Sequence, residues 1–78
     1  MTKAEILAKV KEIMVEVLDA DDVDMDTSIK SDLGADSTEL IDLMLALEEA
    51  FDIDITDSEF AEIDTVEDAV EYIQNALD

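Results

Sequence analysis

Apolar residues recur at helical spacing along most of this chain, and this pattern limits its fold more than any other feature. In the first stretch Ile6, Val10 and Ile13 lie three or four positions apart, so they share one face of a helix. Two further stretches, near 37–51 and 65–77, have the same spacing. A helix of this kind is stable only when its apolar face packs against another element. The pattern therefore predicts an all-α domain.

Capping residues indicate where the first and last helices begin. Thr2 precedes the first apolar pattern and Glu5 follows it three residues later, which is typical of a capping box, so we expect a helix from about Thr2 to Leu18. Thr65 and Asp68 have the same spacing, which places the start of the last helix at Thr65. The expected inner face of that last helix consists of Val66, Ala69, Val70, Ile73 and Leu77.

The middle of the chain carries the second long helix and a short one. The long helix is expected to start at Asp36 or Ser37 and to end near Phe51. A short helix around 58–62 should follow and bury Phe60. Three main helices and one short helix can bury their apolar faces together as a small four-helix bundle, so we expect one domain that covers the whole chain.

Two segments lack the helical period. Residues 19–35 are rich in Asp, and we expect a long loop between the first two helices. Residues 52–56 alternate polar and apolar side chains, but the segment is short and isolated, so we expect an extended connector. The side chains expected to hold the long loop onto the core are Val23, Met25, Ile29 and Leu33.

Charge and missing residue types exclude several functions. The chain has 24 Asp and Glu against 4 Lys and Arg, a net charge of −20, which disfavours binding to nucleic acid or to an anionic membrane and favours partner proteins with basic patches. It contains no Cys and no His, which excludes thiolate or histidine nucleophiles and metal sites built from those ligands. Because no apolar stretch is long enough to span a membrane and no leader is visible, we expect a cytoplasmic monomer without membrane insertion.

Ser37 lies where the loop gives way to the second long helix. A hydroxyl at a helix N-terminus is close to unpaired backbone N–H groups, which favour a phosphate. The same residues also fit ordinary N-capping, with Asp36 as the cap and Glu39 as its partner. Gly34 and Ala35 leave room for another protein to approach. These residues alone leave both interpretations open.

The wider sequence resembles the acyl carrier proteins of bacterial fatty-acid synthesis. The resemblance rests on Asp32-Leu33-Gly34-Ala35-Asp36-Ser37, on Ala46-Leu47-Glu48-Glu49-Ala50-Phe51 and on the order and spacing of the remaining segments over nearly the whole length. It implies that Ser37 carries 4′-phosphopantetheine derived from coenzyme A, with Asp36 and Gly34 in the attachment site. It also implies a carrier and not an enzyme, which holds acyl groups as thioesters during fatty-acid or related lipid or polyketide synthesis.

The resemblance further implies a docking surface on the second long helix. The partners would be a phosphopantetheinyl transferase, which supplies the base and Mg²⁺, and acyl-processing enzymes with basic patches. Leu45 is an apolar residue on the outward face, and Ala46 falls on the same face by helical spacing. Thr38 departs from the large apolar residue, usually Leu, that follows the modified serine in the family. The expected docking residues are Thr38, Glu39, Asp42, Leu45 and Glu49.

Other functions remain open at this level. A carrier of aminoacyl or peptidyl groups is one, and a non-carrier acidic module, such as a nucleic-acid mimic or a calcium buffer, is another. Calcium-binding loops that start at Asp19 or Asp22 lack the required glycine and terminal glutamate, so no metal site is predicted. The family shelters its acyl chain between the helices, but the sequence does not identify the lining residues.

Overall fold

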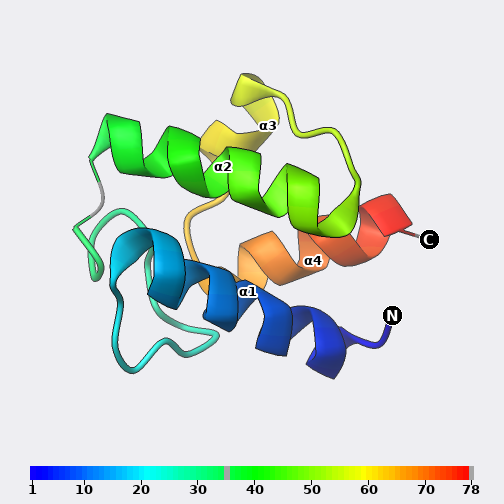
Figure 1. Ribbon diagram of the computed structural model, residues 1–78, viewed down its shortest axis with the longest axis horizontal. Coiled ribbons are helices and arrows are strands. Elements are labelled where there is room, and N and C mark those ends of the chain that lie inside the picture. The colour runs from blue at the N-terminus through cyan, green and yellow to red at the C-terminus, as the bar shows by residue number, and fades with distance from the viewer. Residues whose placement is uncertain (35, 78) are drawn as a thin grey trace.

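The computed structural model describes residues 1–34 and 36–77, and over these residues the chain forms four helices, as expected from the apolar pattern. Two long helices lie antiparallel, a third packs against the first, and a short one lies across the beginning of the second (Figure 1). The helices are α1 (Lys3–Leu18), α2 (Ser37–Phe51), α3 (Asp57–Glu62) and α4 (Val66–Leu77).

The predicted caps set the starts of α1 and α4. The Thr2 hydroxyl accepts a hydrogen bond from the Glu5 N–H at 3.2 Å, and the Thr2 N–H donates to the Glu5 carboxylate at 2.9 Å, which confirms the capping box. At α4 the Asp68 N–H donates to the Thr65 hydroxyl at 3.2 Å. The backbone N–H groups of Thr65 and Asp64 both donate to Asp68, and they lower the pKa of its carboxyl group.

The core lies where the apolar faces of α1, α2 and α4 meet. Fully buried side chains come from all three helices. They include Ile6, Val10, Met14, Leu43, Leu47, Val66, Val70 and Ile73. Leu77 corrects the predicted inner face of α4, because it is 39% exposed. It belongs to the last turn of α4, which lies at the edge of the bundle in Figure 1.

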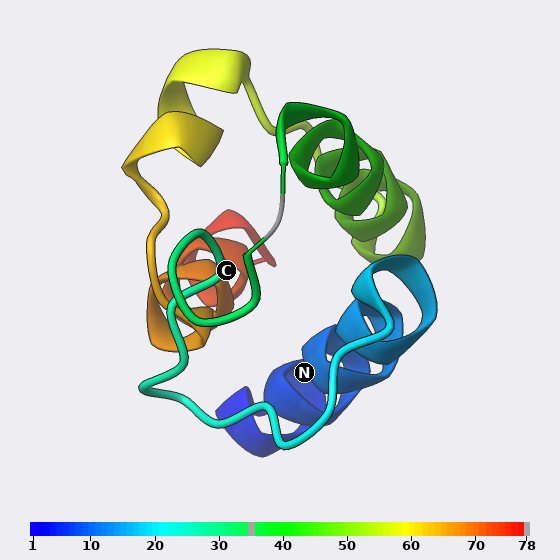
Figure 2. The same ribbon diagram turned by 90° about the vertical axis from the view of Figure 1, so that its left-hand side faces the viewer.

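The long loop between α1 and α2 is fastened to the beginning of α4. Val23 and Ile29 are buried, as predicted, and the Ile29 N–H donates to the Asp64 carbonyl at 2.8 Å. The Val66 N–H, in the first turn of α4, donates to the Thr27 carbonyl at 3.0 Å. The loop thus crosses one end of the bundle, the end where α2 begins (Figure 2). Met25 and Leu33 are half-buried against the core.

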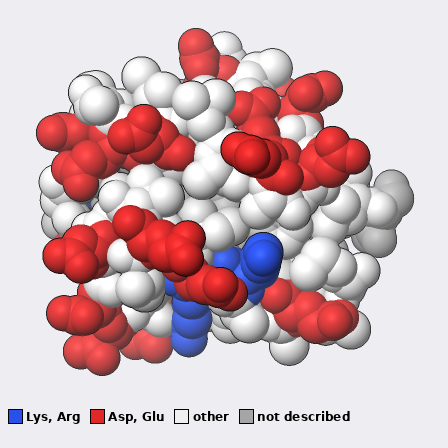
Figure 3. Space-filling view, in the orientation of Figure 1, with Lys and Arg blue, Asp and Glu red and all other residues white. Residues whose placement is uncertain are grey.

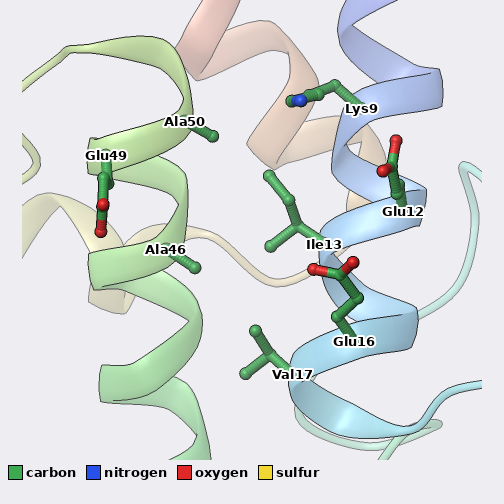
Figure 4. A pocket seen from close by; sticks show the side chains of 8 residues that line it. All are labelled: Lys9, Glu12, Ile13, Glu16, Val17, Ala46, Glu49 and Ala50. Atoms are coloured by element: carbon green, nitrogen blue, oxygen red, sulfur yellow. The ribbon is translucent and has the colours of Figure 1, made fainter.

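Small side chains leave a hollow between α1 and α2. Ala46 and Ala50 point from α2 toward Ile13 and Val17 of α1, and the space between them is about 290 Å³ (Figure 4). Ala46 is half-buried there and contacts the core, so the prediction that it faces outward is wrong. The charged residues around this hollow are Lys9, Glu12, Glu16 and Glu49.

None of the helices in the described residues has the length and apolar character needed to cross a membrane.

Candidate functional site

Ser37 is the first residue of α2, and its side chain is exposed. Asp36 is the N-cap: its carboxylate accepts from the Glu39 N–H at 2.9 Å, and its own N–H lies 3.4 Å from the Glu39 carboxylate. The capping interpretation of Asp36 and Glu39 is therefore correct as local structure. Because Asp36 makes the cap, this role does not occupy the Ser37 hydroxyl, and the two interpretations drawn from the sequence are compatible.

Gly34 turns the chain toward α2. Its φ is +61°, in the left-handed region that residues with a Cβ rarely adopt, and a Cβ added there would meet nothing within 4 Å. The backbone conformation thus favours glycine at this position, while the space around it stays open. Ala35 lies outside the described residues. Just before the turn, the Asp32 carboxylate accepts from the Ser28 N–H at 2.8 Å, which anchors the segment that leads to the site.

A groove of about 270 Å³ begins at Ser37 and runs between α2 and α3. Its surface is mainly apolar, with polar groups from Ser37, Lys30 and Asp57. The short helix forms its second wall because the connector after α2 carries the chain back across the beginning of α2 (Figure 1). The residues that line the groove are Lys30, Ser37, Leu40, Ile41, Met44, Asp57, Phe60 and Ala61.

Polar contacts hold α3 in this position. The Lys30 ammonium group donates to the Ala61 carbonyl at 2.8 Å, so the long loop is joined to the last turn of α3. On the other side, the Tyr72 hydroxyl of α4 donates to the Glu59 carboxylate and lies 3.3 Å from the Asp54 carbonyl. The bond to Glu59 raises the pKa of Tyr72 to about 12, and bonds from Tyr72 and Thr56 lower the pKa of Glu59.

The predicted docking residues share one side of α2, with one qualification. Thr38, Asp42, Leu45 and Glu49 are exposed, whereas Glu39 is half-buried and belongs to the capping box. Acidic side chains form several groups, separated by uncharged residues, on the face drawn in Figure 3, and the few visible basic ones gather over α1. A protein that approaches the face in Figure 3 therefore meets far more acidic than basic side chains.

Three residues were not predicted from the sequence as part of this region: Ile41, Lys30 and Phe60. The side chain of Ile41 is 52% exposed, close to the 53% of Leu45 one turn later. The outward face of α2 therefore presents two large apolar side chains to solvent, where the sequence predicted one. Its spacing of four residues before Leu45 was the available signal. Lys30 and Phe60 come to the groove from other parts of the chain, and no local pattern marks them as neighbours of Ser37.

Comparison with known proteins gives consistent matches. The family model described as phosphopantetheine attachment site matches residues 8–73. An acyl carrier protein of Petrotoga mobilis is 48% identical over 79 residues, with 99% of this chain and 93% of the relative covered. One from Desulforapulum autotrophicum is 50% identical over 70 residues, covering 86% of this chain and 91% of the relative.

Solved structures agree with this similarity. The acyl carrier protein of Enterococcus faecalis has a TM-score of 0.82 and 37% identity, with 97% of this chain and 99% of that chain covered. The crystal structure of an acyl carrier protein from Thermotoga maritima has a TM-score of 0.80 and 32% identity, with 96% of this chain and 89% of that chain covered.

Proposed function

This chain belongs to the acyl carrier proteins, whose prosthetic group is a covalently attached 4′-phosphopantetheine, and from this premise we propose that Ser37 is the attachment residue. Three observations support attachment at Ser37: its side chain is exposed, it is the first residue of a 15-residue helix, and Asp36, not Ser37, caps that helix. The backbone N–H groups of the first turn would favour the negative charge of a phosphodiester at this position.

The prosthetic group supplies a thiol, which holds acyl groups as thioesters. The protein's own contribution is to present the Ser37 hydroxyl in the open. The approach beside Gly34 is open, because nothing lies within 4 Å of the position where its Cβ would be. The chain has no His to act as the base, and the transferase can supply the group that accepts the hydroxyl proton.

We infer that the chain carries acyl intermediates and does not catalyse a reaction itself. The observation that carries this proposal is the exposed Ser37 at the mouth of an apolar groove. Leu40, Ile41, Met44 and Phe60 give that groove a surface suited to methylene groups, each of which gains roughly 0.8 kcal/mol when it leaves water. An apolar acyl chain fits this surface better than an aminoacyl or peptidyl group. We therefore propose a role in fatty-acid or related lipid or polyketide synthesis.

The outward face of α2 is the proposed docking surface. Ile41 and Leu45 supply its apolar centre, and Asp42 and Glu49 supply acidic groups for Lys or Arg on a partner. Such charges mainly accelerate association, so the effect of salt on the association rate is a direct test. Thr38 lies on the same face, next to Ser37. We propose that this residue gives the chain a different choice of partners from that of carrier proteins with Leu at the position.

Intact-protein mass spectrometry tests the attachment site. The protein is incubated with coenzyme A, Mg²⁺ and a phosphopantetheinyl transferase, and we expect one phosphopantetheine mass increment. Ser37→Ala should abolish the increment. Ser58→Ala, which removes an exposed hydroxyl from α3, is the matched control and should keep it. An increment that persists in Ser37→Ala would disprove the assignment.

Charge reversal tests the docking surface. Asp42→Lys on α2 should slow association with the transferase several-fold at low salt, and the difference should shrink as salt is added. Glu67→Lys reverses an exposed acid in the first turn of α4 and changes the net charge equally. Equal rates for the two variants would contradict a docking surface on α2.

A further inference from the structure

Lys30 is the only basic residue after Lys11, and it lies on the groove that begins at Ser37. The other three lysines, Lys3, Lys9 and Lys11, belong to α1. Of these, Lys3 lies 4.0 Å from Glu71 of α4. The chain has only four lysines against 24 acidic residues, and one of these lysines lines the same groove as Ser37.

The ammonium group of Lys30 has hydrogen-bonding capacity left in this position. It donates one hydrogen bond, at 2.8 Å, to the Ala61 carbonyl in the last turn of α3. A lysine ammonium group has three N–H donors and no acceptor, so the remaining donors can bind an anionic oxygen without loss of the bond to Ala61.

We propose that Lys30 binds the phosphodiester of the prosthetic group attached at Ser37, and so joins the modified serine to α3. This inference rests on the proposed function, because it requires attachment at Ser37. The phosphodiester is the occupant that charge complementarity selects: it is the anion fixed covalently to Ser37, and Lys30 is the cation on the same groove.

The surrounding charges make this pairing useful. Asp36 directly precedes Ser37, Glu39 caps the same turn, and Asp57 lies on the groove, so modification adds a negative charge to a region that is already acidic. Lys30 offsets that addition. Because its other contact is the Ala61 carbonyl, the same side chain would also steady the wall of the groove once the protein is modified.

A purely structural role for Lys30 makes a different prediction. If the side chain only satisfies the carbonyl of Ala61, its loss should affect the unmodified and the modified protein equally. If it also binds the phosphodiester, its loss should affect the modified protein more. The difference in melting temperature between the two forms therefore isolates the proposed contact.

The experiment uses modified and unmodified forms of the wild type, Lys30→Gln, Lys30→Arg and Lys9→Gln. Lys9 is an exposed lysine beside the hollow between α1 and α2, so its loss is the matched control for charge. Intact mass first establishes that each protein carries the increment that Ser37→Ala abolishes, and its absence from the wild type would count against the proposed function and not against Lys30. Thermal unfolding of both forms follows at low salt.

We expect modification to lower the melting temperature of Lys30→Gln by about 1–4 °C more than that of the wild type, as an exposed charge pair predicts for a domain of this size. Lys30→Arg and Lys9→Gln should behave like the wild type, and high salt should remove the difference. Equal shifts in Lys30→Gln and Lys9→Gln would overturn the proposal.

A second measurement needs only the wild type. Nuclear magnetic resonance of the lysine ammonium groups should show that modification shifts the Lys30 signal and leaves those of Lys3, Lys9 and Lys11 in place. An unchanged Lys30 signal would overturn the proposal even if all variants are stable.

Discussion

Asp36 caps α2, and we propose that the transferase also recognises its negative charge; two substitutions separate these roles. Its carboxylate caps α2 by accepting from the Glu39 N–H at 2.9 Å. Its negative charge directly precedes Ser37, where a transferase would bind. Asp36→Asn keeps an oxygen acceptor and removes the charge, whereas Asp36→Ala removes both.

The structure fixes the expected magnitude for Asp36→Ala. The substitution removes the bond to the Glu39 N–H, but the bond that runs back from the Asp36 N–H uses the backbone and can remain. Loss of an N-cap to alanine costs about 1 kcal/mol, which corresponds to a decrease in melting temperature of roughly 4–8 °C in a domain of this size.

Asp36→Asn should change stability much less. Asparagine is as good an N-cap as aspartate, and the lost attraction to the helix dipole is offset because one negative charge leaves a chain with a net charge of −20. We expect its melting temperature to stay within about 2 °C of the wild type.

Two assays on the same samples complete the test: thermal unfolding followed by circular dichroism, and the initial rate of modification followed by intact mass. Both variants should be modified slowly, and only Asp36→Ala should lose stability. If Asp36→Asn melts as low as Asp36→Ala, the hydrogen bond of the cap is not the stabilising feature. If Asp36→Asn is modified at the wild-type rate, the charge of Asp36 is not recognised.

Four further outcomes are expected. Leu43→Ala should lower the free energy of unfolding in urea by about 2–5 kcal/mol, because the Leu43 side chain is fully buried between the helices; a loss below this range would mean that the site collapses around the smaller residue. Raising the salt concentration from about 0.01 M to about 1 M should increase the melting temperature, since it shortens the screening length from about 30 Å to about 3 Å on a highly charged surface, and a decrease would refute self-repulsion. Tyr72→Phe should lower the melting temperature at neutral pH. Because the bond to Glu59 raises the pKa of Tyr72 from 10.0 to about 12, the stability it provides is lost as the pH rises from 10 toward 12, which ultraviolet titration of this lone tyrosine would check. Thr38→Leu should strengthen binding to enzymes of general fatty-acid synthesis, measured by titration calorimetry, and an unchanged affinity would show that position 38 does not set partner choice.

The features that the sequence predicted well are local ones. The capping boxes at Thr2 and Asp36, and the cap at Thr65, depend on residues three positions apart, so each can be identified without knowledge of the fold. Burial of Ile6, Val10 and the other inner residues of α1 follows from helical periodicity in the same way.

Errors occurred where burial depends on a neighbouring element. Ala46 has outward-facing spacing on α2, but α1 lies close enough to cover it. Leu77 has inward-facing spacing on α4, but it remains 39% exposed in the last turn. Periodicity gives the direction of a side chain relative to its own helix, and it does not say how far the next helix extends.

The sequence by itself determined which segments become helices, where their caps lie, and that Ser37 opens α2, because these properties arise from interactions over a few residues. Only the tertiary structure decided that α3 returns across the beginning of α2, that the Lys30 ammonium group donates a hydrogen bond to the Ala61 carbonyl, and that the Val66 N–H of α4 donates one to the Thr27 carbonyl. The two hydrogen bonds join residues more than thirty positions apart in the sequence, and α3 reaches the beginning of α2 only after a return of the chain. Such contacts exist only after chain closure, when the burial of the shared core offsets the entropy of closing the loops.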